Sequence, residues 1–125
     1  MKKKFELEYS LNTSPGVLFS RLSTPSGLSE WFADNVNVSG HFFTFFWNGA
    51  EQEAEMIHLK ENKLIRFHWM DDDDPKSFFE FRIDHDEITG DSYLFIVDFA
   101  EDGEKNDAVD LWDSQISELK HVIGL

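Results

Sequence analysis

Residues 41–49, His41-Phe42-Phe43-Thr44-Phe45-Phe46-Trp47-Asn48-Gly49, end in a dipeptide that predicts where two strands turn. Asn-Gly is the strongest short signal for a two-residue hairpin loop, because both central positions of a type I′ turn need a positive φ. Such a loop places Trp47 opposite Ala50 and Phe43 opposite Ala54. The position of one turn therefore predicts the complete register of two strands.

Side chains alternate between the two faces of this predicted hairpin. Opposite Phe42, Thr44 and Phe46, the second strand carries three glutamates, which indicates the face exposed to solvent. The other face is predicted to point inward and holds Phe43, Phe45, Trp47, Ala54 and Met56.

The next turn gives an independent prediction of the same register. If Glu61-Asn62 forms the loop, Met56 pairs with Phe67 and His58 pairs with Ile65. These residues fall on the face already predicted to be inward, whereas a slip of one residue would turn the whole set outward. We therefore expect the inward residues of this hairpin to include Ala54, Met56, His58, Ile65, Phe67 and Trp69.

Three further segments have the composition of strands. Residues 2–12 and 77–84 alternate between apolar and polar side chains, with Phe79, Phe81 and Ile83 on one face of the second segment. The segment 92–100, "SYLFIVDFA", is apolar on both faces, so its orientation stays open. Asp98 either points inward, as a buried carboxylate whose pKa is raised unless it is paired, or faces solvent while Phe95 and Val97 face the core.

Helix signals occur near both ends of the chain. Ser14 before Pro15 and Thr24 before Pro25 each predict a capped helix start. The second of these helices is expected to present Leu28, Trp31 and Phe32 on one side. Near the C-terminus, a long helix starting at Asp107 is predicted from apolar residues at spacings of 3 and 4, namely Val109, Trp112, Ile116, Leu119 and Ile123.

Composition excludes several classes of protein. The net charge is −14, from 25 acidic residues against 11 Lys and Arg, and this charge disfavours nucleic acid and anionic membranes as partners. The chain has no cysteine, so a disulfide scaffold and a Cys nucleophile are absent. No apolar run follows Lys2-Lys3-Lys4, so no signal peptide is predicted. We expect a single domain over residues 1–125, in the cytoplasm, without membrane insertion.

No catalytic or metal-binding motif is present. The five histidines do not lie at metal-ligand spacing, and the sequence has no phosphate loop, HExxH or G-x-S-x-G motif. The acid-rich segments 71–74 and 84–91 do not match the spacing of an EF-hand. The sequence therefore predicts no catalytic residue, no metal site and no cofactor, and we expect a protein that is not an enzyme.

One strand, two short helices, a run of antiparallel strands and a long C-terminal helix resemble the START-like, or Bet v 1-like (SRPBCC), helix-grip fold. The segment "TSPGVLFSRLSTPSGLSEWFADNV" is similar to the opening of the family of activators of the heat-shock-protein-90 ATPase, and "DLWDSQISELKHVIGL" is similar to its closing helix. The resemblance covers nearly the whole chain and implies an α+β fold. Ser39-Gly40 stands where this family usually has Gly-Gly. The superfamily includes carriers, enzymes and chaperone regulators, so the fold alone does not give the function.

Three functions are open at this point. The first is a non-catalytic domain that binds a small apolar or amphipathic ligand between the sheet and the C-terminal helix. The second is a protein-interaction module resembling the chaperone-ATPase activators, and the third is a cyclase- or hydrolase-type enzyme. The expected cavity residues are Trp31, Phe45, Met56, His58, Phe67, Trp69, Phe81 and Trp112.

The outward side of the Asn-Gly hairpin suggests a protein contact. Phe42 and Phe46 lie two residues apart on one strand and face outward beside Glu51 and Glu55. Contiguous exposed apolar surface with a polar rim is typical of an interface. We therefore expect a homodimer or a protein partner on this face of the sheet.

Overall fold

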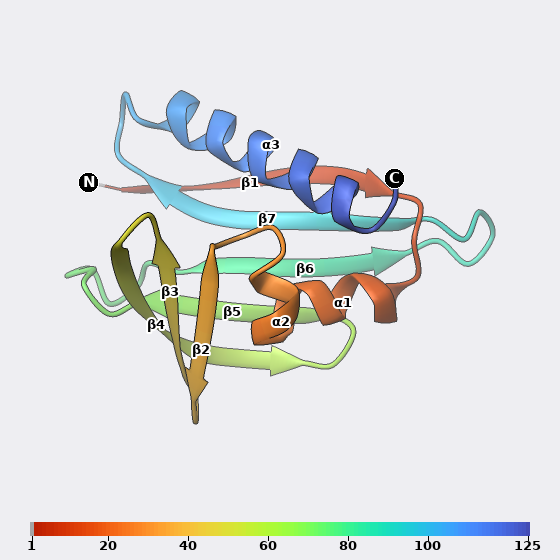
Figure 1. Cartoon of the computed structure of the whole chain (residues 1–125). Helices are drawn as coiled ribbons and strands as arrows, with labels where there is room; N and C mark the ends of the chain where they lie inside the picture. The colour runs from red at the N-terminus through yellow and green to blue at the C-terminus, as the bar shows by residue number, and fades with distance from the viewer. Residues whose placement is uncertain (1) are drawn as a thin grey trace.

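The computed structural model describes residues 2–125 and consists of one curved antiparallel sheet with a long helix across its inner face (Figure 1). The strands occur in the sheet in the order β1-β7-β6-β5-β4-β3-β2. The strands are β1 (Lys3–Leu11), β2 (Asn35–Ser39), β3 (Phe42–Trp47), β4 (Ala50–Lys60), β5 (Leu64–Trp69), β6 (Phe79–His85) and β7 (Ser92–Ala100), and the helices are α1 (Pro15–Ser23), α2 (Pro25–Leu28) and α3 (Lys105–Val122). This is the predicted α+β helix-grip fold, with β2 added as a strand that the sequence did not predict.

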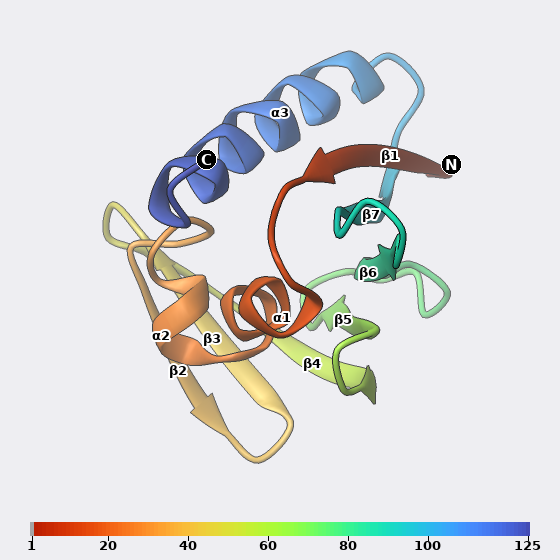
Figure 2. The ribbon, with the colours of Figure 1, turned by 90° about the vertical axis from the view of Figure 1, so that its right-hand side faces the viewer.

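Both N-terminal helices begin at the predicted caps. The hydroxyl of Ser14 accepts a hydrogen bond from the amide of Val17, and that of Thr24 accepts one from the amide of Gly27. Gly27 lies where the helices meet, since a Cβ added to it would lie 2.1 Å from the carbonyl oxygen of Ser20. α1 and α2 therefore pack backbone to backbone, and Figure 2 shows them side by side against the curved sheet.

The second helix is shorter than expected. α2 ends at Leu28, so Trp31 and Phe32 lie in the turn that follows rather than on a helical face. Both residues are nevertheless buried. The indole N–H of Trp31 donates a hydrogen bond to the carbonyl of Arg21 at 2.8 Å, which holds this turn against α1.

The predicted register of the Asn-Gly hairpin is confirmed. Trp47 pairs with Ala50 and Phe43 pairs with Ala54. The turn residues Asn48 and Gly49 have φ values of 43° and 85°, as a type I′ turn requires. Phe43 and Phe45 are buried, while Trp47 is partly buried against the core.

The predicted register of the β4–β5 hairpin is confirmed at the end far from the turn and wrong near the turn. Met56 pairs with Phe67 as predicted, but His58 pairs with Arg66 rather than with Ile65. The turn has three residues, 61–63, and a β-bulge between Met56 and His58 compensates for the additional one. His58 is exposed. The expectation that it faces inward is therefore wrong.

The orientation of β7, which the sequence left open, places Asp98 on the inner face. Leu94 and Ile96 on the same face are fully buried. Phe95 lies on the outer face, under the guanidinium of Arg82 at 4.8 Å from the ring centroid. The alternative in which Phe95 and Val97 face the core is therefore wrong. On the outer side, Arg82 of β6 covers Phe95, and Phe78 contacts Phe99.

The outer face also contains a buried acid. Glu80 is 3% exposed and accepts hydrogen bonds from Arg66 at 2.9 Å and from Arg82 at 3.4 Å. The guanidinium of Arg66 in turn lies 4.0 Å from the ring centroid of Phe78. This arrangement satisfies the charge of Glu80 and covers apolar surface at the same time.

The hairpin patch expected on the outer face has one exposed ring. Phe42 is 38% exposed, whereas Phe46 is half-buried. Three strands separate β3 from β7, so the outward rings of β7 do not extend this patch.

α3 lies across the inner face and starts two residues earlier than predicted. Trp112, Ile116 and Leu119 of the predicted stripe are buried, and Val109 is partly buried. At its N-terminus, Glu104 makes no side-chain capping bond. Further along, the hydroxyl of Tyr9 in β1 donates a hydrogen bond to Asp113 at 2.6 Å.

Among residues 2–125, no helix combines the length and apolar character that a membrane span needs.

Candidate functional site

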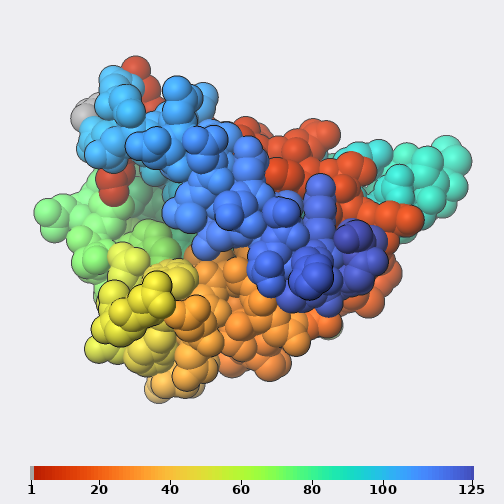
Figure 3. Space-filling model, turned by 45° about the horizontal axis from the view of Figure 1, so that its top comes forward, coloured from red at the N-terminus to blue at the C-terminus, as the bar shows by residue number. Residues whose placement is uncertain are grey.

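A pocket of about 420 Å³ lies between the inner face of the sheet, the turn after α2 and the first half of α3. Figure 3 shows the surface hollowed between the first turns of α3 and the β3–β4 hairpin. The residues that line the pocket are Phe32, Trp47, Gln52, Trp69, Phe79, Asp98, Ala108, Leu111, Trp112 and Gln115.

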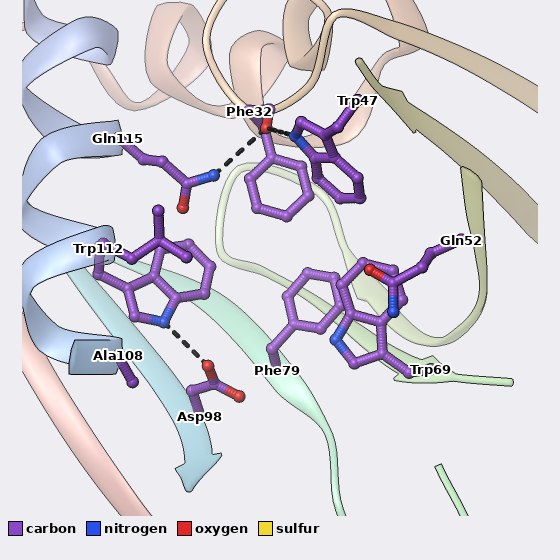
Figure 4. Close-up of a pocket in the computed structure, with 10 residues that line it drawn as sticks. Phe32, Trp47, Gln52, Trp69, Phe79, Asp98, Ala108, Trp112 and Gln115 are labelled. Atoms are coloured by element: carbon purple, nitrogen blue, oxygen red, sulfur yellow. Dashed lines mark hydrogen bonds between the residues drawn. The ribbon is translucent and has the colours of Figure 1, made fainter. Parts of the chain in front are cut away.

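Aromatic rings form most of the pocket wall (Figure 4). Phe32 lies between two of them, stacked on Trp112 at 5.9 Å and on Phe79 at 5.8 Å between ring centroids. Trp69 stacks on the same Phe79 at 4.8 Å, and Trp47 lies 6.2 Å from Trp69. Because each ring is packed against another, the wall is preformed.

Asp98 provides a carboxylate at one side of this wall. Its Oδ2 accepts a hydrogen bond from the indole N–H of Trp112 at 2.9 Å, and its Oδ1 accepts one from the amide of Phe99 at 2.8 Å. Burial raises the pKa of Asp98 above its usual 3.8, and these two hydrogen bonds oppose the rise. The pocket therefore contains a carboxylate that has lost much of its hydration.

Two amide side chains complete the polar lining. Gln115 of α3 donates a hydrogen bond to the carbonyl oxygen of Phe32 at 3.3 Å, and the indole N–H of Trp47 donates to the same oxygen at 2.8 Å. Across the pocket, Gln52 donates to Asp71 at 3.3 Å. The turn after α2, α3 and the β3–β4 hairpin are thus joined through the pocket wall.

The surroundings of the pocket are acidic. Lys2 pairs with Asp72 at 2.9 Å, and this pair lies close enough to Asp98 to influence its pKa. Hydrogen bonds from Ser77 and Lys2 hold the pKa of Asp72 at about 2, so this carboxylate stays charged. Further acids border the adjoining surface, namely Asp71, Asp73, Asp74, Glu101, Glu104 and Asp107.

The residues predicted to line a cavity occupy four different environments. Trp69 and Trp112 lie in the pocket wall, and Trp31 lines an adjoining shallow hollow with Phe32 and Trp47. Beneath the wall, the fully buried core holds Phe45, Phe67 and Phe81, with Met56 partly buried against it. His58 lies outside the pocket on the exposed end of β4.

Several pocket residues were not in the predicted set. The inward parity of Trp47 and Phe79 was readable from the alternation of their strands, and the position of Asp98 within "LFIVDFA" was itself a signal. Gln52 had the same signal, since the predicted register pairs it with inward Phe45. Ala108, Leu111 and Gln115 had none, because they reach the pocket only through the placement of α3 over the hairpin.

Within residues 2–125, no three His, Asp or Glu side chains converge closely enough to hold a metal ion. Asp98 has no titratable hydrogen-bond partner, since its partners are an indole and a backbone amide. The arrangement can accept a hydrogen bond or an ion pair from a bound molecule whose apolar part lies against the rings.

Similarity to known proteins extends over the whole chain. A model of the START-like superfamily domain matches residues 1–125. The solution structure of the protein BfR322 from Bacteroides fragilis is 41% identical, covers 99% of this chain and 93% of that one, and has a TM-score of 0.71.

More distant structures share the fold alone. The Aha1 dimer from Colwellia psychrerythraea is 16% identical over 94% of this chain and 93% of that chain, with a TM-score of 0.79. CalU16 from Micromonospora echinospora is 12% identical over 98% and 74% of the two chains, with a TM-score of 0.77. No curated protein matches the sequence significantly. The family match over the complete chain agrees with the sheet order and the crossing helix: the chain belongs to the START-like superfamily.

Proposed function

We propose that the protein is a non-catalytic binding domain that holds a small apolar or amphipathic ligand in the pocket between the sheet and α3. The observation that supports this is a space of about 420 Å³ lined by Trp47, Trp69, Trp112 and two phenylalanines. Small-molecule sites are typically concave, largely apolar and furnished with a few placed polar groups. Asp98, Gln52 and Gln115 are such groups here.

A binding role also agrees with the isolation of Asp98. General acid–base catalysis needs a proton donor or acceptor within reach of the reacting group, commonly oriented by a partner. The hydrogen bonds of Asp98 come from Trp112 and from the amide of Phe99, neither of which titrates near neutral pH. The absence of a titratable hydrogen-bond partner for Asp98 among the described residues supports a binding function over an enzymatic one.

The fluorescence of the pocket tryptophans offers a direct test. Trp47, Trp69 and Trp112 line the pocket, so an apolar ligand that enters it should change their emission and raise the melting temperature. We expect both effects with members of a panel of small amphiphiles.

A pair of variants on α3 locates the binding. Ala108→Phe places a ring into the pocket and should abolish both effects. Ser114→Phe adds the same ring at an exposed position of the same helix and should leave them unchanged. Equal responses of the two variants, or no response of the wild type to any amphiphile, would contradict the proposal.

A second candidate function is a protein-interaction module, and Phe42 favours it. This ring is 38% exposed and pairs across the strand with Glu55. Capture of a specific partner by the wild type but not by a Phe42→Ser variant, with no stabilisation by any small molecule, would favour this function over ligand binding.

A further inference from the structure

We propose that the pocket selects an organic cation, in which a primary or secondary ammonium pairs with Asp98 and the apolar body lies among the aromatic rings. The inference rests on the proposed binding function and specifies the chemical class of the ligand. Three features of the site support it: the spare acceptor capacity of Asp98, the rings around it and the charge of the surrounding surface.

Asp98 has acceptor sites left over. A carboxylate offers about four lone-pair positions, and the structure assigns one partner to each oxygen, Trp112 to Oδ2 and Phe99 to Oδ1. Figure 4 shows one oxygen directed at the Trp112 indole and the other away from it. An ammonium group could therefore bond to Asp98 without displacing either partner.

The rings suit a cation as well as an apolar chain. The face of a Trp or Phe ring attracts a cation within about 6 Å of its centroid, and Trp does so most strongly. Trp69 and Trp112 belong to the pocket wall on either side of Phe79, and Asp98 lies beside Trp112 (Figure 4). Asp98 lies at the N–H edge of Trp112, and the rings line the same pocket, so a ligand whose ammonium pairs with Asp98 places its body against them.

The charge of the surface around the pocket also favours binding of a cation. Lys2 is the basic residue that influences Asp98, and its charge is already paired with Asp72. The other charged side chains on the surface next to Lys2 are acidic, among them Asp71, Glu104 and Asp107. With a net charge of −14, the protein attracts cations and repels anions before contact.

Three probes of one length separate charge from apolar binding: n-octylammonium, 1-octanol and octanoate. Each is titrated by calorimetry into the wild type, into Asp98→Asn and into Asp110→Asn. The Asp98→Asn side chain keeps an oxygen for the Trp112 indole and loses the charge. Asp110 is exposed on α3, so its variant makes the same change in net charge away from the pocket.

We expect the wild type to bind n-octylammonium at least about tenfold more tightly than 1-octanol, equivalent to about 1.4 kcal/mol, and octanoate most weakly. In Asp98→Asn the preference for the ammonium should disappear, while in Asp110→Asn it should remain. Equal or tighter binding of 1-octanol or octanoate by the wild type overturns the cation inference and leaves the proposed binding function standing. Binding of none of the three, together with a failed amphiphile panel, overturns the binding function itself.

A measurement on the wild type alone covers the case in which the variant does not fold. The groups that act on Asp98 are Trp112 from α3, the amide of Phe99, Lys2 before β1 and Asp72 in the β5–β6 loop. Since burial raises the pKa of Asp98 and a bound cation lowers it again, binding should release protons near that pKa. Affinity for n-octylammonium should fall on acidification, while that for 1-octanol stays constant. The same pH dependence for both probes would overturn the inference.

Discussion

The indole N–H of Trp112 lies 2.9 Å from Oδ2 of Asp98 and donates a hydrogen bond to it, joining α3 to β7 across the pocket. The indole is 6% exposed and also stacks on Phe32. One side chain therefore forms part of the core, lines the pocket and stabilises a carboxylate.

Replacing Trp112 should strongly destabilise the fold. Trp112→Ala removes a buried ring, for which the usual loss is roughly 3–5 kcal/mol of unfolding free energy, and it also leaves Oδ2 of Asp98 without its donor. Leu111→Ala is the control, because Leu111 is 61% exposed on the neighbouring position of α3. Urea melts of both variants test this. A loss below about 1 kcal/mol for Trp112→Ala would contradict the packing of α3 described here.

The stability contributed by Asp98 should fall as pH rises. Its folded pKa lies above the usual 3.8, so between these two values the folded protein binds more protons than the unfolded chain. The contribution is therefore greatest below the unfolded pKa and decreases as pH passes through the folded pKa. We expect the unfolding free energy of the wild type, relative to Asp98→Asn, to decrease from about pH 4 to pH 7. Urea melts across this range measure it, and an increase with pH would contradict the burial of this carboxylate.

The contact between α1 and α2 predicts a large difference between two glycines. A Cβ at Gly27 would lie 2.1 Å from the Ser20 carbonyl oxygen and 2.7 Å from the Arg21 Cα, so Gly27→Ala forces the helices apart. The expected loss is roughly 1–3 kcal/mol or more. Gly16→Ala is the matched control in α1: no atom lies within 4 Å of its added Cβ, and a gain of up to about 1 kcal/mol is expected. Equal changes of melting temperature in Gly27→Ala and Gly16→Ala would contradict this close contact between α1 and α2.

Phe42 and Phe46 give a prediction about association. If the outer face of the β3–β4 hairpin is an interface between copies, the wild type should sediment as a larger species at high concentration, and Phe42→Ser/Phe46→Ser should sediment as a monomer. The exposed ring of Phe42 beside Glu55 supports this expectation. A monomeric wild type that also captures no partner would exclude the interface.

The sequence predicted most accurately where one residue type demands one geometry. Asn48-Gly49 requires positive φ at both positions, and the β3–β4 register follows from it residue by residue. At residues 61–63, Asn62 alone has a positive φ, and neither the turn length nor the bulge near Ile57 has a comparable signature. The additional turn residue and the bulge offset each other, so the predicted pairing is right at Met56, beyond the bulge, and wrong at His58, between the bulge and the turn.

The pocket was harder to predict than the sheet, because it depends on where α3 lies. Alternation along a strand gives the inward face, and on that basis Trp69 was placed correctly on it. Alternation does not say whether an inward ring is covered by a helix, and Phe45 and Phe67 proved to be fully buried beneath the wall. Asp98 was undecided for a related reason: both faces of β7 are apolar, and only Arg82 and its neighbours explain the outer one.

The start of α3 has a consequence for how a molecule would enter and leave. Glu104 makes no side-chain capping bond there, whereas Gln115, Asp113 and Trp112 anchor the middle of the helix to the rest of the fold. Ala108, which lines the pocket, follows the first turn and packs with Val109 against the core. Fraying of the uncapped first turn would therefore loosen this edge of the site while the sheet and its aromatic wall stay in place. Exchange of a bound molecule would then depend on the local unwinding of a helix end.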